Sequence, residues 1–158
     1  MKKRVIVIIF ILIITIVFIY NFISTNYKKI IKDEIGIDVS SCKLTNKYNT
    51  KGSFGDGEYV VILDCGKSKT LKKQIKNWNK TPMDKKTINN IYGNDDEGYS
   101  TIGRIASNYN IPMIKKGYYV FYDQSPTTPY NLGDTAMNFI CAIYDDKNQK
   151  LYYIEYDS

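Results

Sequence analysis

The stretch NFICAIYDDKNQKLYYIEYDS, residues 138–158, contains two apolar and aromatic runs separated by the polar tetrapeptide DKNQ. The runs 138–145 and 150–157 are rich in tyrosine, isoleucine and phenylalanine, which are favoured in β-strands. Polar residues between two such runs are typical of a tight connection. The stretch therefore predicts a β-hairpin. Fifteen tyrosines and a single tryptophan in 158 residues also favour a tyrosine-rich sheet.

A second hairpin is predicted nearer the start of the chain. Residues 39–48 and 58–65 alternate as strands do, and NTKGSFGDG (49–57) between them has the composition of a turn. A loop centred between Ser53 and Phe54 gives one register of cross-strand pairs: Tyr48 with Tyr59, Leu44 with Leu63, Lys43 with Asp64, and Cys42 with Cys65. This register pairs aromatic with aromatic, leucine with leucine and lysine with aspartate, and cross-strand packing favours such pairs.

The register predicts that Cys42 and Cys65 form a disulfide. Directly opposed residues of antiparallel strands have Cα atoms about 4.5–5.5 Å apart, within the range that a disulfide spans. Such a bond persists outside the cytosol and not within it. The alternative is two buried thiols. Cys141 alternates with Phe139 and Ile143 and is expected in the core.

The segment between the two hairpins predicts two or three helices. Gly66-Lys67-Ser68 lacks the first glycine of a phosphate-binding loop, because Val61 stands in its place. Ser68 instead suits the N-cap of a helix over 69–79, and Asp84 that of a second helix ending at Gly93. A weaker helix is predicted within 99–108, a strand over 117–123 and a loop over 124–135. The fold class is therefore α+β, with a mainly antiparallel sheet of about five strands.

The N-terminal part predicts a membrane anchor. Residues 1–4 are basic, and residues 5–23 form an apolar run close to the length of a transmembrane helix. A cleaved signal peptide is the alternative, but Phe22 stands where a peptidase needs a small residue. We expect an uncleaved single-pass anchor with the N-terminus inside, although Lys28, Lys29 and Lys32 oppose that orientation. Residues 24–37 are predicted to be a helical stalk that Gly36 ends, and residues 38–158 a single α+β domain.

The composition excludes several kinds of site. The chain has no histidine and three cysteines, so imidazole bases, histidine-ligated metals and a four-cysteine metal site are ruled out within one chain. The acidic run GNDDEG (93–98) fails as an EF-hand, since Arg104 stands where that loop needs glutamate. Asp123, Asp134 and Glu155 are the remaining candidates for acid–base work, with no spacing that indicates convergence. We predict no catalytic residue, no cofactor and no metal.

Two surfaces are predicted to make contacts. A lysine-rich segment is expected to face anionic lipid headgroups or an anionic cell-wall polymer, a solvated helix face being the alternative; its residues are Lys69, Lys72, Lys73, Lys76 and Lys80. Aromatic residues of the strand 117–123 and the following loop are expected to meet an unknown protein partner; they are Tyr118, Tyr119, Tyr122 and Tyr130. Nucleic acid is not expected, because the chain after the apolar run has 19 basic and 16 acidic residues and no base-reading motif.

Several landmarks resemble a family of small uncharacterised proteins from Gram-positive bacteria, often with an N-terminal membrane span. NTKGSFGDG (49–57) is similar to a THGGFHGDG hairpin of that family, and WNKTPM (78–83) to its W..LPL segment. IPMIKKGYYVFYDQS (111–125) is similar to IP.IENGYYFF.DRH, and the closing stretch to NFTLAIYD….LYYYEYDT. The family's histidines are missing: Lys51 replaces one, a second is deleted, and Asp123-Gln124-Ser125 stands for Asp-Arg-His. The resemblance implies no activity.

Three functions are consistent with these patterns. The favoured one is a membrane-anchored, non-catalytic interaction domain on the outer face of the cytoplasmic membrane, held in the lipid bilayer by residues 5–23. The second is a cytoplasmic-facing, immunity-like protein, which reduced Cys42 and Cys65 would favour. The third is a carboxylate-dependent hydrolase, which would need two carboxylates about 5–10 Å apart across a cleft.

Overall fold

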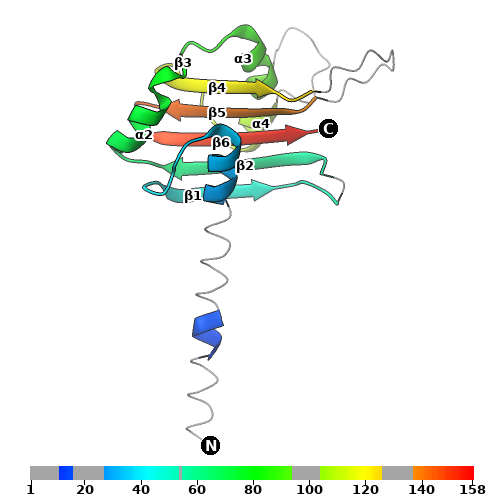
Figure 1. The fold of residues 1–158 in the computed structure, drawn as a ribbon. Helices are drawn as coiled ribbons and strands as arrows, with labels where there is room; N and C mark the ends of the chain where they lie inside the picture. Colours follow the sequence, from blue (N-terminus) through cyan, green and yellow to red (C-terminus); the bar gives the residue numbers. More distant parts are fainter. Residues whose placement is uncertain (1–10, 16–26, 54, 94–103, 126–136) are drawn as a thin grey trace, which may run out of the picture. The chain divides into compact units, whose positions relative to one another are not determined.

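The computed structural model describes residues 11–15, 27–53, 55–93, 104–125 and 137–158 (Figure 1). Residue contacts divide the chain into two units, Met1–Ser40 and Ser41–Ser158. In the first unit, residues 11–15 and 27–35 are helical. The second of these helices ends at Gly36, whose φ is +71° and whose N–H donates to the Lys32 carbonyl at 3.0 Å. Glycine adopts this left-handed conformation without the cost a side chain would add.

Most of the predicted membrane span, residues 5–23, lies outside the described residues. Its described part, 11–15, is helical. Among the helices that the structure describes, none is both long enough and apolar enough to cross a bilayer. The transmembrane anchor therefore stays a prediction.

The second unit has an α+β fold built on one antiparallel sheet (Figure 1). The strands are β1 (Lys43–Asn49), β2 (Gly57–Asp64), β3 (Asn79–Lys80), β4 (Gly117–Asp123), β5 (Phe139–Asp145) and β6 (Lys150–Asp157). Their order across the sheet is β1-β2-β6-β5-β4-β3. Both predicted hairpins are present, and they meet where β2 lies beside β6. The sheet has six strands rather than about five, because the two-residue β3 adds to its edge.

The helices are short, and two of them, α2 and α3, begin at the predicted caps. They are α2 (Lys69–Gln74), the 3₁₀ helix η1 (Ile75–Asn77), α3 (Lys85–Tyr92) and α4 (Ile105–Asn108). The side chains of Ser68 and Asp84 accept hydrogen bonds from the backbone N–H groups of Leu71 and Thr87, which confirms both N-caps. Gly93 follows α3, with φ +82°.

The predicted length of the first helix, 69–79, is wrong. Beyond Gln74 the chain tightens into η1, and Trp78 is extended, with φ −68° and ψ 159°. Asn79 and Lys80 then pair with Tyr119 and Tyr118 of β4. The open edge of β4 thus pairs with Asn79, the last residue that local periodicity assigned to the helix. Of the predicted third helix, 99–108, the structure describes α4, and residues 99–103 lie outside the described residues.

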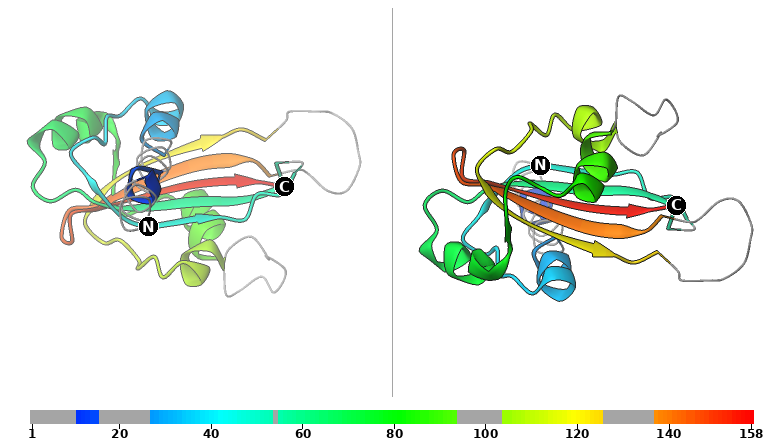
Figure 2. Two further views of the ribbon diagram at one scale, coloured as in Figure 1. Left: turned by 90° about the horizontal axis from the view of Figure 1, so that it is seen from below. Right: turned by 90° about the horizontal axis from the view of Figure 1, so that it is seen from above.

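The sheet separates two layers of helices, with α2 on one face and α3 and α4 on the other (Figure 2). One hydrophobic core cluster lies on the α3–α4 face. Its buried members are Val60, Ile62, Met83, Ile91, Ile105, Ala106, Tyr109, Ile111, Ile114, Tyr119, Phe139, Cys141, Ile143, Tyr152 and Ile154. The alternate residues of the central strands are also buried, among them Val61, Leu63, Tyr144 and Tyr153, as are Leu71 and Ile75. The central strands are therefore buried on both faces.

One predicted pair of the first hairpin is wrong. Lys43 faces Asp64 and Leu44 faces Leu63, as predicted, but the register shifts between Leu44 and Asn46. Tyr48 consequently opposes Val60 and not Tyr59. The extra residue of a β-bulge moves the following side chains to the other face of the strand. Tyr48 then packs on Tyr109, with ring centroids 4.8 Å apart.

Candidate interaction surfaces

A disulfide joins Cys42 and Cys65 just beyond the last cross-strand pair of β1 and β2. Their Cα atoms are 4.1 Å apart and 23 positions separate them in the chain. Both residues are buried. The bond fastens β1, whose residues are mostly exposed, to the buried strand β2. Cys141 is a free cysteine in the core, and burial raises the pKa of its thiol far above the ordinary value.

The candidate carboxylates do not converge. Asp123 is in register with Phe139 and, across β5, with Tyr156, so it belongs to the α3–α4 face. Glu155 pairs with Tyr59 and Ile140 and belongs to the opposite face. Neither is free, because Lys86 lies 2.6 Å from Asp123 and Lys51 lies 2.5 Å from Glu155. Asp134 lies outside the described residues. The two described carboxylates therefore cannot act on one substrate across a cleft.

Metal binding has no candidate in the part of the chain that the structure describes. No group of three or more Asp, Glu or Cys side chains there is placed to hold an ion. Most of the acidic run 93–98 lies outside the described residues.

The lysines predicted to meet an anionic surface are all exposed: Lys69, Lys72, Lys73, Lys76 and Lys80. Lys72 forms an ion pair with Asp146 at 2.7 Å, and this hydrogen bond raises the pKa of Lys72. The other four form no ion pair with any described residue. Four of the five charges are therefore available to an external anion.

Tertiary structure adds further lysines to this group. One cross-sheet row runs through Lys43, Asp64, Lys150, Asp145 and Gly117 and marks one end of the sheet. We call the lysines gathered at this end of the sheet the basic end. Some belong to the row itself or to the connections that leave it, and the others belong to α2, η1 and β3. Together they are Lys43, Lys67, Lys69, Lys72, Lys73, Lys76, Lys80, Lys115, Lys116, Lys147 and Lys150. The added lysines could have been found from the sequence by noting that each lies in or next to the end of a predicted strand, at the end of the sheet where these strand ends meet.

The three acids at this end are already engaged. Asp145 is buried and accepts hydrogen bonds from the backbone of Lys147 and from both nitrogens of Asn148. Asp64 accepts from the N–H of Gly66, and Asp146 pairs with Lys72. The basic end thus has eleven lysines, and its three carboxylates leave most of them unneutralised.

The aromatic strand offers less surface than predicted. Tyr119 is buried with 5% of its surface exposed, and its hydroxyl donates to Asp84 Oδ2 at 3.0 Å. It supports the start of α3 and has no surface to offer a partner. Tyr118 is half-buried and Tyr122 is 44% exposed. Tyr130 lies outside the described residues.

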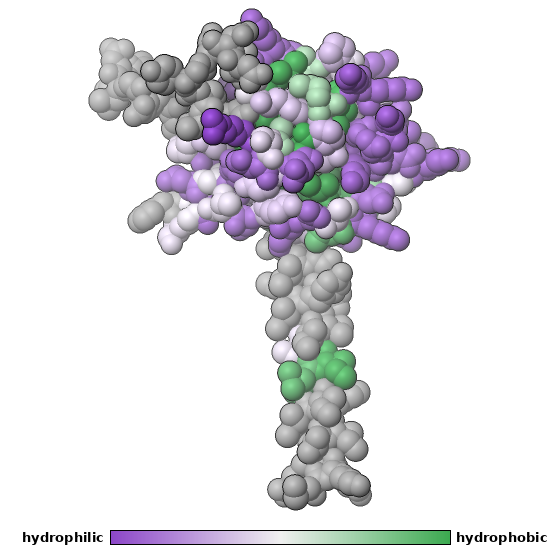
Figure 3. Space-filling model, turned by 180° about the vertical axis from the view of Figure 1, so that it is seen from behind, coloured by the Kyte–Doolittle hydropathy of each residue, from purple (hydrophilic) through white to green (hydrophobic). Residues whose placement is uncertain are grey.

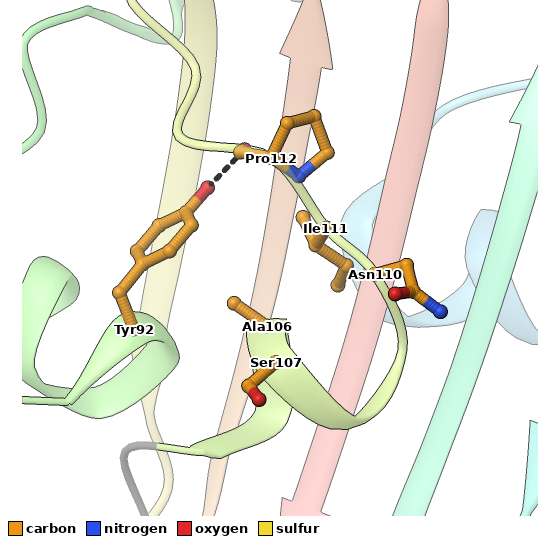
Figure 4. Close-up of a pocket in the computed structure, with 6 residues that line it drawn as sticks. All are labelled: Tyr92, Ala106, Ser107, Asn110, Ile111 and Pro112. Carbon is orange, nitrogen blue, oxygen red and sulfur yellow. Dashed lines mark hydrogen bonds between the residues drawn. The ribbon is translucent and has the colours of Figure 1, made fainter.

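A groove of about 540 Å³ lies beside α4 on the α3–α4 face. Figure 4 shows the hydroxyl of Tyr92 donating to the Pro112 carbonyl, at 2.9 Å, across this groove. Burial raises the pKa of Tyr92 above its ordinary value, so the phenol stays neutral. The groove is lined by Tyr92, Ala106, Ser107, Asn110, Ile111 and Pro112. This lining has no acid or base suited to proton transfer near neutral pH.

No protein-family model, curated protein or solved structure matches this chain. The family resemblance therefore stays a prediction.

Proposed function

We propose that this protein is a membrane-anchored, non-catalytic interaction domain on the outer face of the cytoplasmic membrane. The observation that carries the proposal is the disulfide between Cys42 and Cys65. A bond of this kind persists where the environment is oxidising and is reduced in the cytosol. The apolar run 5–23, preceded by basic residues, supplies the anchor and the orientation.

The arrangement of side chains supports binding rather than catalysis. Asp123 and Glu155 lie on opposite faces of the sheet, and each is paired with a lysine. The exposed features of the domain are instead a lysine-rich end and the half-exposed strand that contains Tyr122. Such features suit contact with a polymer, a surface or a protein.

Thiol labelling of intact cells tests the proposal. Cells that express the whole chain are treated with a membrane-impermeant maleimide, before or after mild reduction, then quenched, denatured and treated with a second maleimide. We expect reduction of intact cells to free two thiols that unreduced cells lack, and the second maleimide should label them after denaturation at Cys42 and Cys65. A variant with Cys42→Ser and Cys65→Ser should lose that signal, and Cys141 should react only after denaturation because it is fully buried.

The opposite result would favour the second function. If Cys42 and Cys65 are already reduced and react only after cell lysis, the domain faces the cytoplasm. The immunity-like function would then take first place.

A further inference from the structure

We infer that the basic end of the sheet binds a linear phosphodiester polymer through its phosphates. This inference rests on the proposed function, because it names the partner of the proposed interaction domain. It extends the lysine cluster of one segment to a surface assembled from four separate parts of the chain, around positions 43, 67–80, 115–116 and 147–150.

The charged side chains at the two ends of the sheet differ in how many are engaged in ion pairs. At the far end, Lys51 contacts both Glu155 and Asp157, and Lys86 contacts Asp123, so each of these two lysines is already paired with carboxylate. At the basic end the structure shows one ion pair among the described residues, between Lys72 and Asp146. Unpaired lysines gathered at one edge attract a polyanion and release its counterions on binding.

The shape of the basic end favours a flexible polymer over a flat bilayer. Lys69, Lys73 and Lys76 lie on the α2 side of the sheet, while Lys115 and Lys116 end the connection that arrives from α4 on the other side (Figure 2). Figure 3, seen from the α3–α4 side, shows hydrophilic side chains projecting where β4 begins. The lysines therefore curve around the end of the sheet, which spans roughly 19 Å from β1 to β4 at the usual strand spacing. A polymer follows such a strip, whereas a plane touches one side of it.

The single tryptophan provides a local reporter. Trp78 is half-buried and stands between Lys76 and Lys80. Its fluorescence therefore reports binding at the basic end without an added label. The whole chain is held in micelles of an uncharged detergent and titrated with poly(glycerol phosphate) at several salt concentrations.

The test compares two triple variants, each of which removes three positive charges. The first removes three lysines of the basic end, Lys73→Gln, Lys116→Gln and Lys147→Gln. The second removes three charges elsewhere, Lys47→Gln, Lys86→Gln and Arg104→Gln. We expect the first to weaken binding about tenfold and to lower the slope of log K against log salt by roughly 2. The second should change the affinity less than about twofold, because its three charges lie outside the basic end.

Four results would overturn the inference. They are no binding at low salt, equal effects of the two triple variants, single-stranded DNA binding far more tightly than poly(glycerol phosphate) at equal phosphate, and a lysine-dependent response to phosphatidylglycerol vesicles without one to the polymer. Absence of binding would mean that there is no polyanion site, and equal effects of the two variants would mean that only the net charge matters. Tighter binding of DNA would indicate recognition of bases. A response to vesicles alone would assign the surface to the bilayer. None of these binding results changes the outcome of the thiol labelling, so failure of polymer binding can be distinguished from failure of the proposed function.

Discussion

The ammonium group of Lys51 lies 2.5 Å from the carboxylate of Glu155, although 104 positions separate the two residues in the chain. The same ammonium also contacts Asp157. Lys51 belongs to the loop between β1 and β2, while both carboxylates project from β6. One side chain thus fixes the loop of the first hairpin against the last strand. All three side chains are less than one-third exposed, which limits screening by solvent.

Replacing this lysine should destabilise the domain. We expect Lys51→Ala to lower the free energy of unfolding by about 2 kcal/mol, because it leaves two partly buried carboxylates side by side without a cation. Lys47→Ala removes a neighbouring lysine that has no such partners and is the matched control. Chemical denaturation at pH 7 measures both. Equal losses in the two variants would show that the bridge contributes nothing specific.

The same bridge should respond to alkaline pH. Burial opposes the charged form, but the hydrogen bonds to Asp157 and Glu155 outweigh it, so the pKa of Lys51 is raised above 10.5. A raised pKa in the folded state gives stability that is fully present below pH 10.5 and is lost as the pH rises through the folded value. The difference in melting temperature between the native chain and Lys51→Ala should therefore shrink above about pH 10.5. A difference that stays constant up to pH 12 would contradict this assignment.

The disulfide should stabilise the domain by roughly 3 kcal/mol, since it closes a loop of 23 residues. We expect reduction, or the double change Cys42→Ser and Cys65→Ser, to lower the free energy of unfolding by that amount and so to lower the unfolding midpoint. Reductant should have no further effect on the double variant, which serves as the control. If the unfolding midpoint of the native chain does not change when reductant is added, the bond contributes nothing to stability.

Asp84 should be sensitive to acid. Burial opposes its charged form, but the hydrogen bonds from Thr87 and the Tyr119 hydroxyl prevail and hold the pKa of Asp84 below 3.8. Asp84→Ala should cost about 1 kcal/mol at pH 7 by removing the cap of α3, whereas Asp84→Asn keeps a capping oxygen. Stability from a lowered pKa is present above pH 3.8 and is lost as the pH falls through the folded value. The native chain should therefore lose its advantage over Asp84→Asn only below pH 3.8; a loss between pH 5 and 7 would contradict the assignment.

Gly117 at the start of β4 should not tolerate a side chain. A Cβ atom there would lie 1.9 Å from the backbone oxygen of Tyr144, which β5 holds in place. We expect Gly117→Ala to cost roughly 3 kcal/mol or more, because backbone must move to relieve the overlap. Gly52→Ala is the control, since a Cβ there meets nothing nearer than 3.9 Å. Similar melting temperatures for the two variants would show that the close approach is relieved cheaply.

Local sequence determined most of the elements. Alternation and turn composition predicted both hairpins and the strand 117–123, and the capping residues Ser68 and Asp84 fixed where α2 and α3 begin. These features depend on residues within a few positions of one another, so the sequence carries them directly. Lys43 opposite Asp64 followed from the same local register.

Tertiary structure alone decided how these elements combine. The pairing of β2 with β6, the bulge that moves Tyr48 onto Tyr109 and the capture of Asn79 by β4 each depend on partners distant in the chain. For the same reason, the sequence predicted five lysines along one segment, while the folded sheet brings eleven to a single end. Side-chain periodicity assigns a residue to a face of its own element, but only packing between elements determines which charges become neighbours.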